Sequence, residues 1–143
     1  MLILLTIHSI VRWVITLVAI ALIVRLALGL ARKLPFDKTA RGLTAAFAGL
    51  MDAQMLLGIL YLLVSGFGMV SNATSGFPRY RWEHALAMTI AVVVAHLPAR
   101  WKTAPDGIRT RNTLIAVIAA LIIVFIGIAP LGGWVRWWNI TLP

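Results

Sequence analysis

The chain has 143 residues, of which 62% are hydrophobic and 12% are charged, and it contains no cysteine. A soluble domain averages about 45–50% apolar and about 25% charged residues, so this composition excludes a soluble globular domain as well as a disordered chain. The lack of cysteine excludes disulfides, iron–sulfur clusters and cysteine nucleophiles. With 13 Lys and Arg against 4 Asp and Glu, the formal charge is +9.

Four stretches are long and apolar enough to cross a bilayer, whose hydrocarbon core of about 30 Å requires about 20 helical residues. They are expected at about residues 2–30, 43–64, 80–98 and 113–130. The first carries Arg12 inside the apolar run, so it is expected to be a retained helix rather than a cleaved signal peptide. The sequence therefore predicts an all-α polytopic membrane protein, with residues 1–143 forming a single four-helix transmembrane domain.

The basic residues are concentrated in the first and third connecting segments. Eight of the 13 lie there, namely Arg32, Lys33, Lys38, Arg41, Arg100, Lys102, Arg109 and Arg111. By the positive-inside rule these segments face the cytoplasm, which places the N-terminus and the C-terminus on the outer, periplasmic side. A basic rim facing the membrane explains most of the charge, so no nucleic-acid partner is expected. The predicted location is the bacterial cytoplasmic (inner) membrane, crossed several times.

Ionisable side chains inside spanning helices are costly and are therefore candidates for function. His8 and Arg12 are four residues apart and share one face of the first helix. Glu83 and His84 lie in the outer part of the third helix, on the same side of the membrane. The sequence thus predicts a polar cluster of these four residues in the outer half of the bundle.

Two chemistries fit this outer cluster. In one, His8 and His84 are the axial ligands of a b-type haem iron, because each neutral imidazole supplies one nitrogen. The haem-binding set is then His8, His84, Arg12, Arg79 and Arg81, with the arginines near the propionates. In the other, Arg12 pairs with Glu83 and the histidines hydrogen-bond across the bundle, without a cofactor.

A second, interior polar site is predicted at Asp52, Gln54 and Glu83. Asp52 lies about 16 Å beyond Arg41 at 1.5 Å per residue, near the middle of the membrane. A carboxylate at that depth either meets a cation or takes up a proton. Asp52 could pair with Arg12, act as a proton-relay or quinone-side group, or form an interhelical hydrogen bond.

His96 lies near the cytoplasmic end of the third helix and is expected to be an interfacial histidine. It is 12 residues from His84, about 120° away around the helix, so the two do not share a face. Three histidines cannot serve two bis-histidine haems, which limits that ligation to one haem. No phosphate-binding glycine loop, zinc motif or activated nucleophile is present, and whether the protein is an enzyme is left open.

Three short motifs carry a resemblance. The segment from His8 to Trp13 (HSIVRW), the segment from Gln54 to Gly58 (QMLLG) and the pair Glu83-His84 together resemble a family of small four-helix bacterial membrane proteins often labelled "cytochrome b"-like or uncharacterised. The KLPF sequence at Lys33–Phe36 is also similar to that family's first cytoplasmic loop.

This resemblance implies a b-cytochrome-like or respiratory-chain-associated membrane protein. The shared polar positions that it implies are His8, Arg12, Gln54 and His84. The chain departs from the family at Asp52, where related sequences tend to carry a histidine.

The function expected from the sequence is a small b-cytochrome-like integral membrane subunit that binds haem b or contacts quinone and serves electron transfer. Its expected partners are the lipid bilayer and other membrane subunits of a larger complex. One alternative is a cofactor-free accessory subunit of a respiratory or photosynthetic complex. Another is a small proton- or ion-coupled transporter with Asp52 as the coupling group.

Overall fold

The structure is a computed structural model that describes residues 2–64 and 79–131. These residues form four α-helices: α1 (Leu2–Ala31), α2 (Lys38–Val64), α3 (Arg79–His96) and α4 (Asp106–Ile128). Short 3-10 helices follow α3 (η2, Leu97–Trp101) and α4 (η3, Ala129–Leu131). The four α-helical stretches are each long and apolar enough to span a membrane. The expected all-α protein with four spans is therefore confirmed, whereas the sides on which the termini lie stay a prediction.

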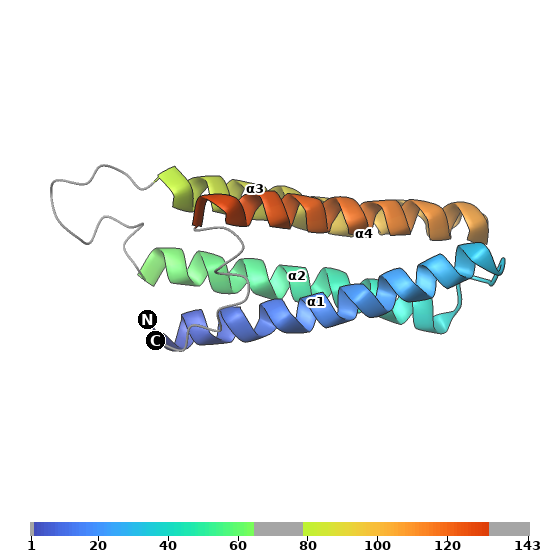
Figure 1. The fold of residues 1–143 in the computed structure, drawn as a ribbon, viewed down its shortest axis with the longest axis horizontal. Coiled ribbons are helices and arrows are strands. Elements are labelled where there is room, and N and C mark those ends of the chain that lie inside the picture. Colours follow the sequence, from blue (N-terminus) through green and yellow to red (C-terminus); the bar gives the residue numbers. More distant parts are fainter. Residues whose placement is uncertain (1, 65–78, 132–143) are drawn as a thin grey trace, which may run out of the picture.

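The helices run alternately up and down in two layers, with α1 and α2 in one layer and α3 and α4 in the other (Figure 1). Each helix packs on its neighbours in sequence, and α1 also packs on α4, which closes the bundle. The α1–α2 and α3–α4 connections lie at the same end of the bundle (Figure 1). Because the first and third basic segments lie there, we call it the basic end.

The core is a stripe of small and medium-sized apolar side chains. On α1 the buried positions are Ile15, Ala19, Leu22 and Leu26, and this spacing of three and four residues keeps them on one helix face. The buried core of the described residues comprises Ile15, Ala19, Leu22, Leu26, Phe36, Ala40, Phe47, Met51, Ala91, Ala95, Val117 and Ala120. Alanines at these positions let the helix backbones approach closely, as is usual between membrane helices.

Helix α2 begins at Lys38, five residues before the apolar stretch that the sequence marks. Asp37 caps it: its Oδ1 accepts a hydrogen bond of 2.9 Å from the backbone N–H of Ala40. The other carboxylate oxygen of Asp37 lies 2.9 Å from Arg25 Nη2 on α1. Helix α4 likewise begins at Asp106 rather than at about residue 113. Hydropathy finds only the apolar part of each helix; the start of α2 is fixed by the Asp37 cap, whereas α4 starts after Pro105 without a side-chain cap.

Helix α3 ends at His96 and continues as the 3-10 helix η2. Pro98 lies at the start of η2, has no N–H to donate and disfavours α-helical geometry in the residue before it. The expected end at about residue 98 was therefore two residues late. His96 is thus the last residue of α3.

The first connection is fixed to the helices around it. Arg25 Nη2 also donates to the Pro35 carbonyl at 3.2 Å. The Phe36 ring is buried, and the guanidinium of Arg109 on α4 lies 4.1 Å from the ring centroid, within cation–π range. These contacts attach the α1–α2 connection to α1 and to α4 at the basic end.

The pKa of Asp37 lies below its usual value of 3.8, chiefly because the Ala40 N–H, and then Arg25, favour the charged carboxylate. A carboxyl group with a lowered pKa in the folded state stabilises the fold above the unfolded-state pKa. That contribution is lost as the pH falls through the folded-state value. We expect the melting temperature in detergent to fall by a few degrees as the pH is lowered below about 4.

The variant Asp37→Asn should show a smaller acid-dependent loss, because asparagine keeps the cap but has no charge to titrate. Melting followed by circular dichroism at a series of acid pH values measures the effect. Asp106→Asn, which removes another exposed carboxylate at the basic end, should keep the wild-type acid dependence. Equal acid losses in wild type and Asp37→Asn would contradict the assignment.

Helices α3 and α4 approach each other closely at Gly127. A Cβ atom at this position would lie 2.6 Å from Ala87 Cβ and 2.7 Å from Met88 Cε, closer than real Cβ contacts allow. The methyl of Ala87 is fixed to its backbone and cannot turn aside. Glycine at 127 is therefore required for the separation of α3 and α4 at this level.

We expect Gly127→Ala to lower the free energy of unfolding by about 1–3 kcal/mol, because the added methyl overpacks the α3–α4 contact. Gly49→Ala is the matched control, since a Cβ at Gly49 on α2 would meet nothing within 4 Å. It should leave stability unchanged or raise it slightly, because alanine favours helix. Unfolding by SDS titration of the purified protein compares the two, and an equal effect of both substitutions would contradict the close approach.

Candidate functional site

The outer polar cluster forms at the end of the bundle opposite the basic end and draws on all four helices. Gln54 of α2 donates from Nε2 to the His8 carbonyl of α1 at 3.0 Å. The His8 ring packs against Gly58, where an ideal Cβ would lie 3.6 Å from His8 Cε1. Gln54 and Gly58 thus fix the backbone and the ring of His8, as one face of α2 can do at a spacing of four residues.

His84 on α3 is tied to α4. Its Nδ1 lies 2.9 Å from the carbonyl oxygen of Gly127. A carbonyl oxygen only accepts, so Nδ1 carries the proton and donates. In the neutral imidazole Nε2 then holds a lone pair. The close approach that Gly127 permits and this hydrogen bond together fix the tautomer and the orientation of His84.

His8 has a buried ring nitrogen without a hydrogen bond. Within residues 2–64 and 79–131, His8 Nδ1 and Gln54 Oε1 are both buried and find no partner. Buried polar atoms are nearly always paired, and each exception calls for an explanation. Both atoms lie in the outer polar cluster: the His8 side chain on α1 contacts α2, and the Gln54 side chain on α2 contacts α1.

His8, Arg12 and His84 lie toward the same end of the bundle, on the first part of α1 and of α3. Arg12 donates from Nη2 to Ser9 Oγ at 3.1 Å, within α1. The expected grouping of His8, Arg12 and His84 into one site stays a prediction. Glu83 is exposed next to His84 at the start of α3.

The two other arginines of the predicted haem-binding set lie at the start of α3. The Arg81 guanidinium is 5.8 Å from the centroid of the neighbouring Tyr80 ring. Arg79 is the first residue of α3, and its side chain lies outside the described part of the chain.

The predicted interior site of Asp52, Gln54 and Glu83 does not form one group. Asp52 and Gln54 are two residues apart on α2, so they point about 200° away from each other. Gln54 joins the outer cluster, while Asp52 contacts His96 on α3: His96 Nε2 lies 2.9 Å from Oδ1 and 3.1 Å from Oδ2. The partner of Asp52 is thus His96 rather than Arg12.

Sequence reasoning missed the Asp52–His96 pair because it placed the two residues at different depths. Asp52 was expected near the membrane centre and His96 at the cytoplasmic surface. The contact between the two side chains shows that His96 and Asp52 lie at the same level of the bundle.

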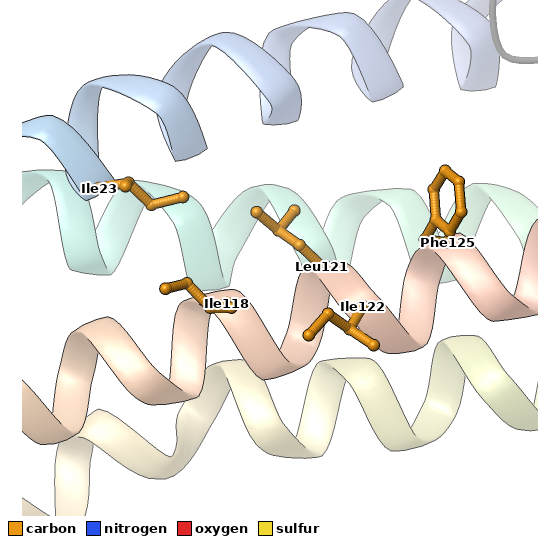
Figure 2. Close-up of a pocket in the computed structure, with 5 residues that line it drawn as sticks. All are labelled: Ile23, Ile118, Leu121, Ile122 and Phe125. Carbon is orange, nitrogen blue, oxygen red and sulfur yellow. The ribbon is translucent and has the colours of Figure 1, made fainter.

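A shallow hollow of about 300 Å³ lies between α1 and α4, and Figure 2 shows its lining. The residues are Ile23 of α1 and Ile118, Leu121, Ile122 and Phe125 of α4. All five side chains are apolar, so this hollow offers no hydrogen bond to a ligand. It is a surface that lipid chains can cover, and the functional candidates are the two polar clusters.

No protein-family model, curated protein or solved structure matches the chain. The resemblance to small four-helix cytochrome b-like membrane proteins therefore stays a prediction. In the described ranges no three His, Cys, Asp or Glu side chains gather into a metal-binding group.

Proposed function

We propose that the chain is a small b-cytochrome-like membrane subunit in which His8 and His84 hold one haem b. In this proposal it serves electron transfer within a larger complex of the bacterial cytoplasmic membrane, with both termini on the periplasmic side. The observation that carries the proposal is the hydrogen bond from His84 Nδ1 to the Gly127 carbonyl.

That hydrogen bond is the arrangement that suits a metal-binding imidazole. A ligating histidine nearly always donates its second ring N–H to a carbonyl, a carboxylate or water, which fixes the tautomer and makes the other nitrogen more basic. With Nδ1 engaged at 2.9 Å, Nε2 of His84 is the nitrogen available to iron. The backbone of α4 thereby positions a ligand on α3.

His8 is the second proposed ligand, because its imidazole on α1 lies toward the same end of the bundle as His84 on α3. Its Nδ1 is buried without a partner among the described residues, and a bound group at the cluster would relieve this cost. Gln54 and Gly58 hold the His8 backbone and ring in place. The donor set of the cluster therefore fits a haem iron with two imidazole ligands.

Arg12 is the proposed partner of a haem propionate, since it lies on the His8 face of α1 and carries a fixed positive charge. Arg81 and Arg79 at the start of α3 are the further candidates for this role. Bound haem would supply a one-electron redox couple. The protein would supply the ligands, the compensating charge and an apolar surrounding, which together set the reduction potential.

The test is the dithionite-reduced minus oxidised visible spectrum of the detergent-purified protein, with a pyridine haemochrome assay for stoichiometry. We expect a b-type α-band that His8→Ala and His84→Ala each abolish, because each removes one axial ligand. His96→Ala is the matched control, since His96 is the third histidine and bonds to Asp52 instead. It should retain the band.

A colourless protein, purified from cells supplied with haem, would contradict the proposal and favour the cofactor-free accessory subunit. A band that persists in both ligand variants would contradict the assignment of the ligands. If His96→Ala loses the α-band while His8→Ala and His84→Ala keep it, the haem binds at the Asp52–His96 pair instead.

A further inference from the structure

The contact between α1 and α4, which we call the α1–α4 seam, runs from the basic end into the hollow of Figure 2. Near the basic end Gly29 lies against Thr110, because a Cβ at Gly29 would lie 3.4 Å from Thr110 Cγ2. Ile23 on α1 and Ile118 on α4 line the hollow together. They are six and eight residues from that contact, which corresponds to about 9–12 Å at 1.5 Å per residue. The hollow therefore continues the seam away from the basic end.

Arg111 stands on the face of α4 that carries the hollow, nearer the basic end. Ile118, Ile122 and Phe125, which line the hollow, follow Arg111 by 7, 11 and 14 residues. At 100° per residue these intervals bring the three side chains within about 40° of Arg111 around the helix. The guanidinium and the apolar lining thus share one face of α4, with the charge at its basic end.

The α1 side of the seam is apolar at the level of Arg111. Leu30 follows Ile23 by seven residues on α1, so the two side chains share a face. The Leu30 side chain is 37% exposed. Leu30 and Arg111 are each one residue from the Gly29–Thr110 contact. A molecule in the hollow can therefore extend between Leu30 and Arg111 toward the basic end.

The Arg111 side chain is exposed and has hydrogen-bond donors left. Its Nε donates to Asn112 Oδ1 at 3.3 Å. Across residues 2–64 and 79–131 it makes no ion pair with a carboxylate. Asp106, five residues earlier on α4, lies about 140° away around the helix. The two Nη groups of Arg111 can therefore donate to an anion.

The neighbouring arginines of α1 and α4 are engaged in the fold. Arg25 lies 2.9 Å from the Asp37 carboxylate, which neutralises it. Arg109 donates to the Lys102 carbonyl at 3.2 Å and packs over an aromatic ring of the first connection. These two side chains attach the connections to the helices. Arg111 is the arginine of the seam whose charge is left for a ligand.

The depth of the hollow matches the chains of a lipid whose head meets Arg111. A bilayer of about 40–45 Å, headgroups included, gives each leaflet about 20 Å. Ile118 and Phe125 lie about 10 and 21 Å from Arg111 along α4. The hollow thus lies at the level of the acyl chains of the leaflet that meets the basic end. Its lining offers no hydrogen bond, which suits an alkyl chain, while a guanidinium binds a phosphate through two parallel hydrogen bonds.

We propose that the α1–α4 seam is a binding site for one anionic phospholipid. Arg111 binds the phosphate, the glycerol part lies beside Leu30, and one acyl chain occupies the hollow between Ile23 and Phe125. An anionic head supplies negative charge without adding a cation to the basic end, so the site favours it over a zwitterionic head. This inference uses neither of the two polar clusters and does not depend on the proposed haem site.

The test is native mass spectrometry of the full chain, purified in detergent and titrated with phosphatidylglycerol or with phosphatidylcholine of the same acyl chains. We expect one phosphatidylglycerol per chain, bound about fivefold more tightly than phosphatidylcholine. Glycerol 3-phosphate has the phosphate without the chains. It should leave the bound lipid in place at equal concentration.

Arg111→Gln tests the position of the head. It should weaken phosphatidylglycerol binding about fivefold and remove the preference over phosphatidylcholine, because the charged hydrogen bonds to the phosphate are lost. Arg41→Gln is the matched control, since it removes the same charge from an exposed position at the basic end, on α2 rather than in the seam. It should bind like the wild type.

Ile118→Trp tests the position of the chain, because the larger side chain fills the hollow. Ile126→Trp makes the same change on α4 at a side chain that is 62% exposed and does not line the hollow. We expect Ile118→Trp to weaken phosphatidylglycerol binding about fivefold and Ile126→Trp to leave it unchanged. Melting temperatures show that the variants are folded.

Three outcomes would overturn the inference. Equal binding of phosphatidylglycerol and phosphatidylcholine would show that lipids cover the seam without selection. Equal losses in Arg111→Gln and Arg41→Gln would show that only the overall charge of the basic end matters. Displacement of the lipid by glycerol 3-phosphate would show a phosphate site that makes no use of the hollow. Haem content is measured in the same samples, so a failure of this site is distinguished from a failure of the His8–His84 site.

Discussion

The structure depends on one constraint: a polar group on a spanning helix has no water to bind, so another group of the protein must satisfy it. Three side chains meet this constraint by bonding between helices, across three of the four helix contacts. Gln54 joins α2 to α1 through the His8 carbonyl, Asp52 joins α2 to α3 through His96, and His84 joins α3 to α4 through the Gly127 carbonyl. The fourth contact, between α1 and α4, is made in the buried apolar core.

These hydrogen bonds lie at two places on the bundle: two of them are in the outer polar cluster, and the third joins Asp52 to His96. The bond of Gln54 fixes the backbone of His8, and the bond of His84 fixes its own imidazole. Neither bond uses His8 Nδ1 or His84 Nε2. The bond between Asp52 and His96 lies elsewhere, between α2 and α3, where both side chains are about half exposed.

Hydropathy and length predicted four helices because the bilayer sets both quantities. The positions of His8, Arg12 and His84 on one side of the membrane followed from helix order and residue counting. Helix ends could not be predicted in the same way, because the Asp37 cap and Pro98 act through hydrogen bonds and backbone geometry. The contact of His96 with Asp52 was missed. The bond from His84 to Gly127 was also missed, because every residue has a backbone carbonyl and the sequence does not show which carbonyl accepts a hydrogen bond.

The central claim is that two imidazoles on different helices coordinate one haem iron. Electron paramagnetic resonance of the oxidised, purified protein tests it most directly, because the ferric spin state reports the axial ligands. The account predicts a low-spin ferric signal from the wild-type protein that becomes high-spin in any haem retained by His8→Ala or His84→Ala. It also predicts that added imidazole restores the low-spin signal in these variants. A protein without haem, or one whose low-spin signal is the same in both variants, would contradict it.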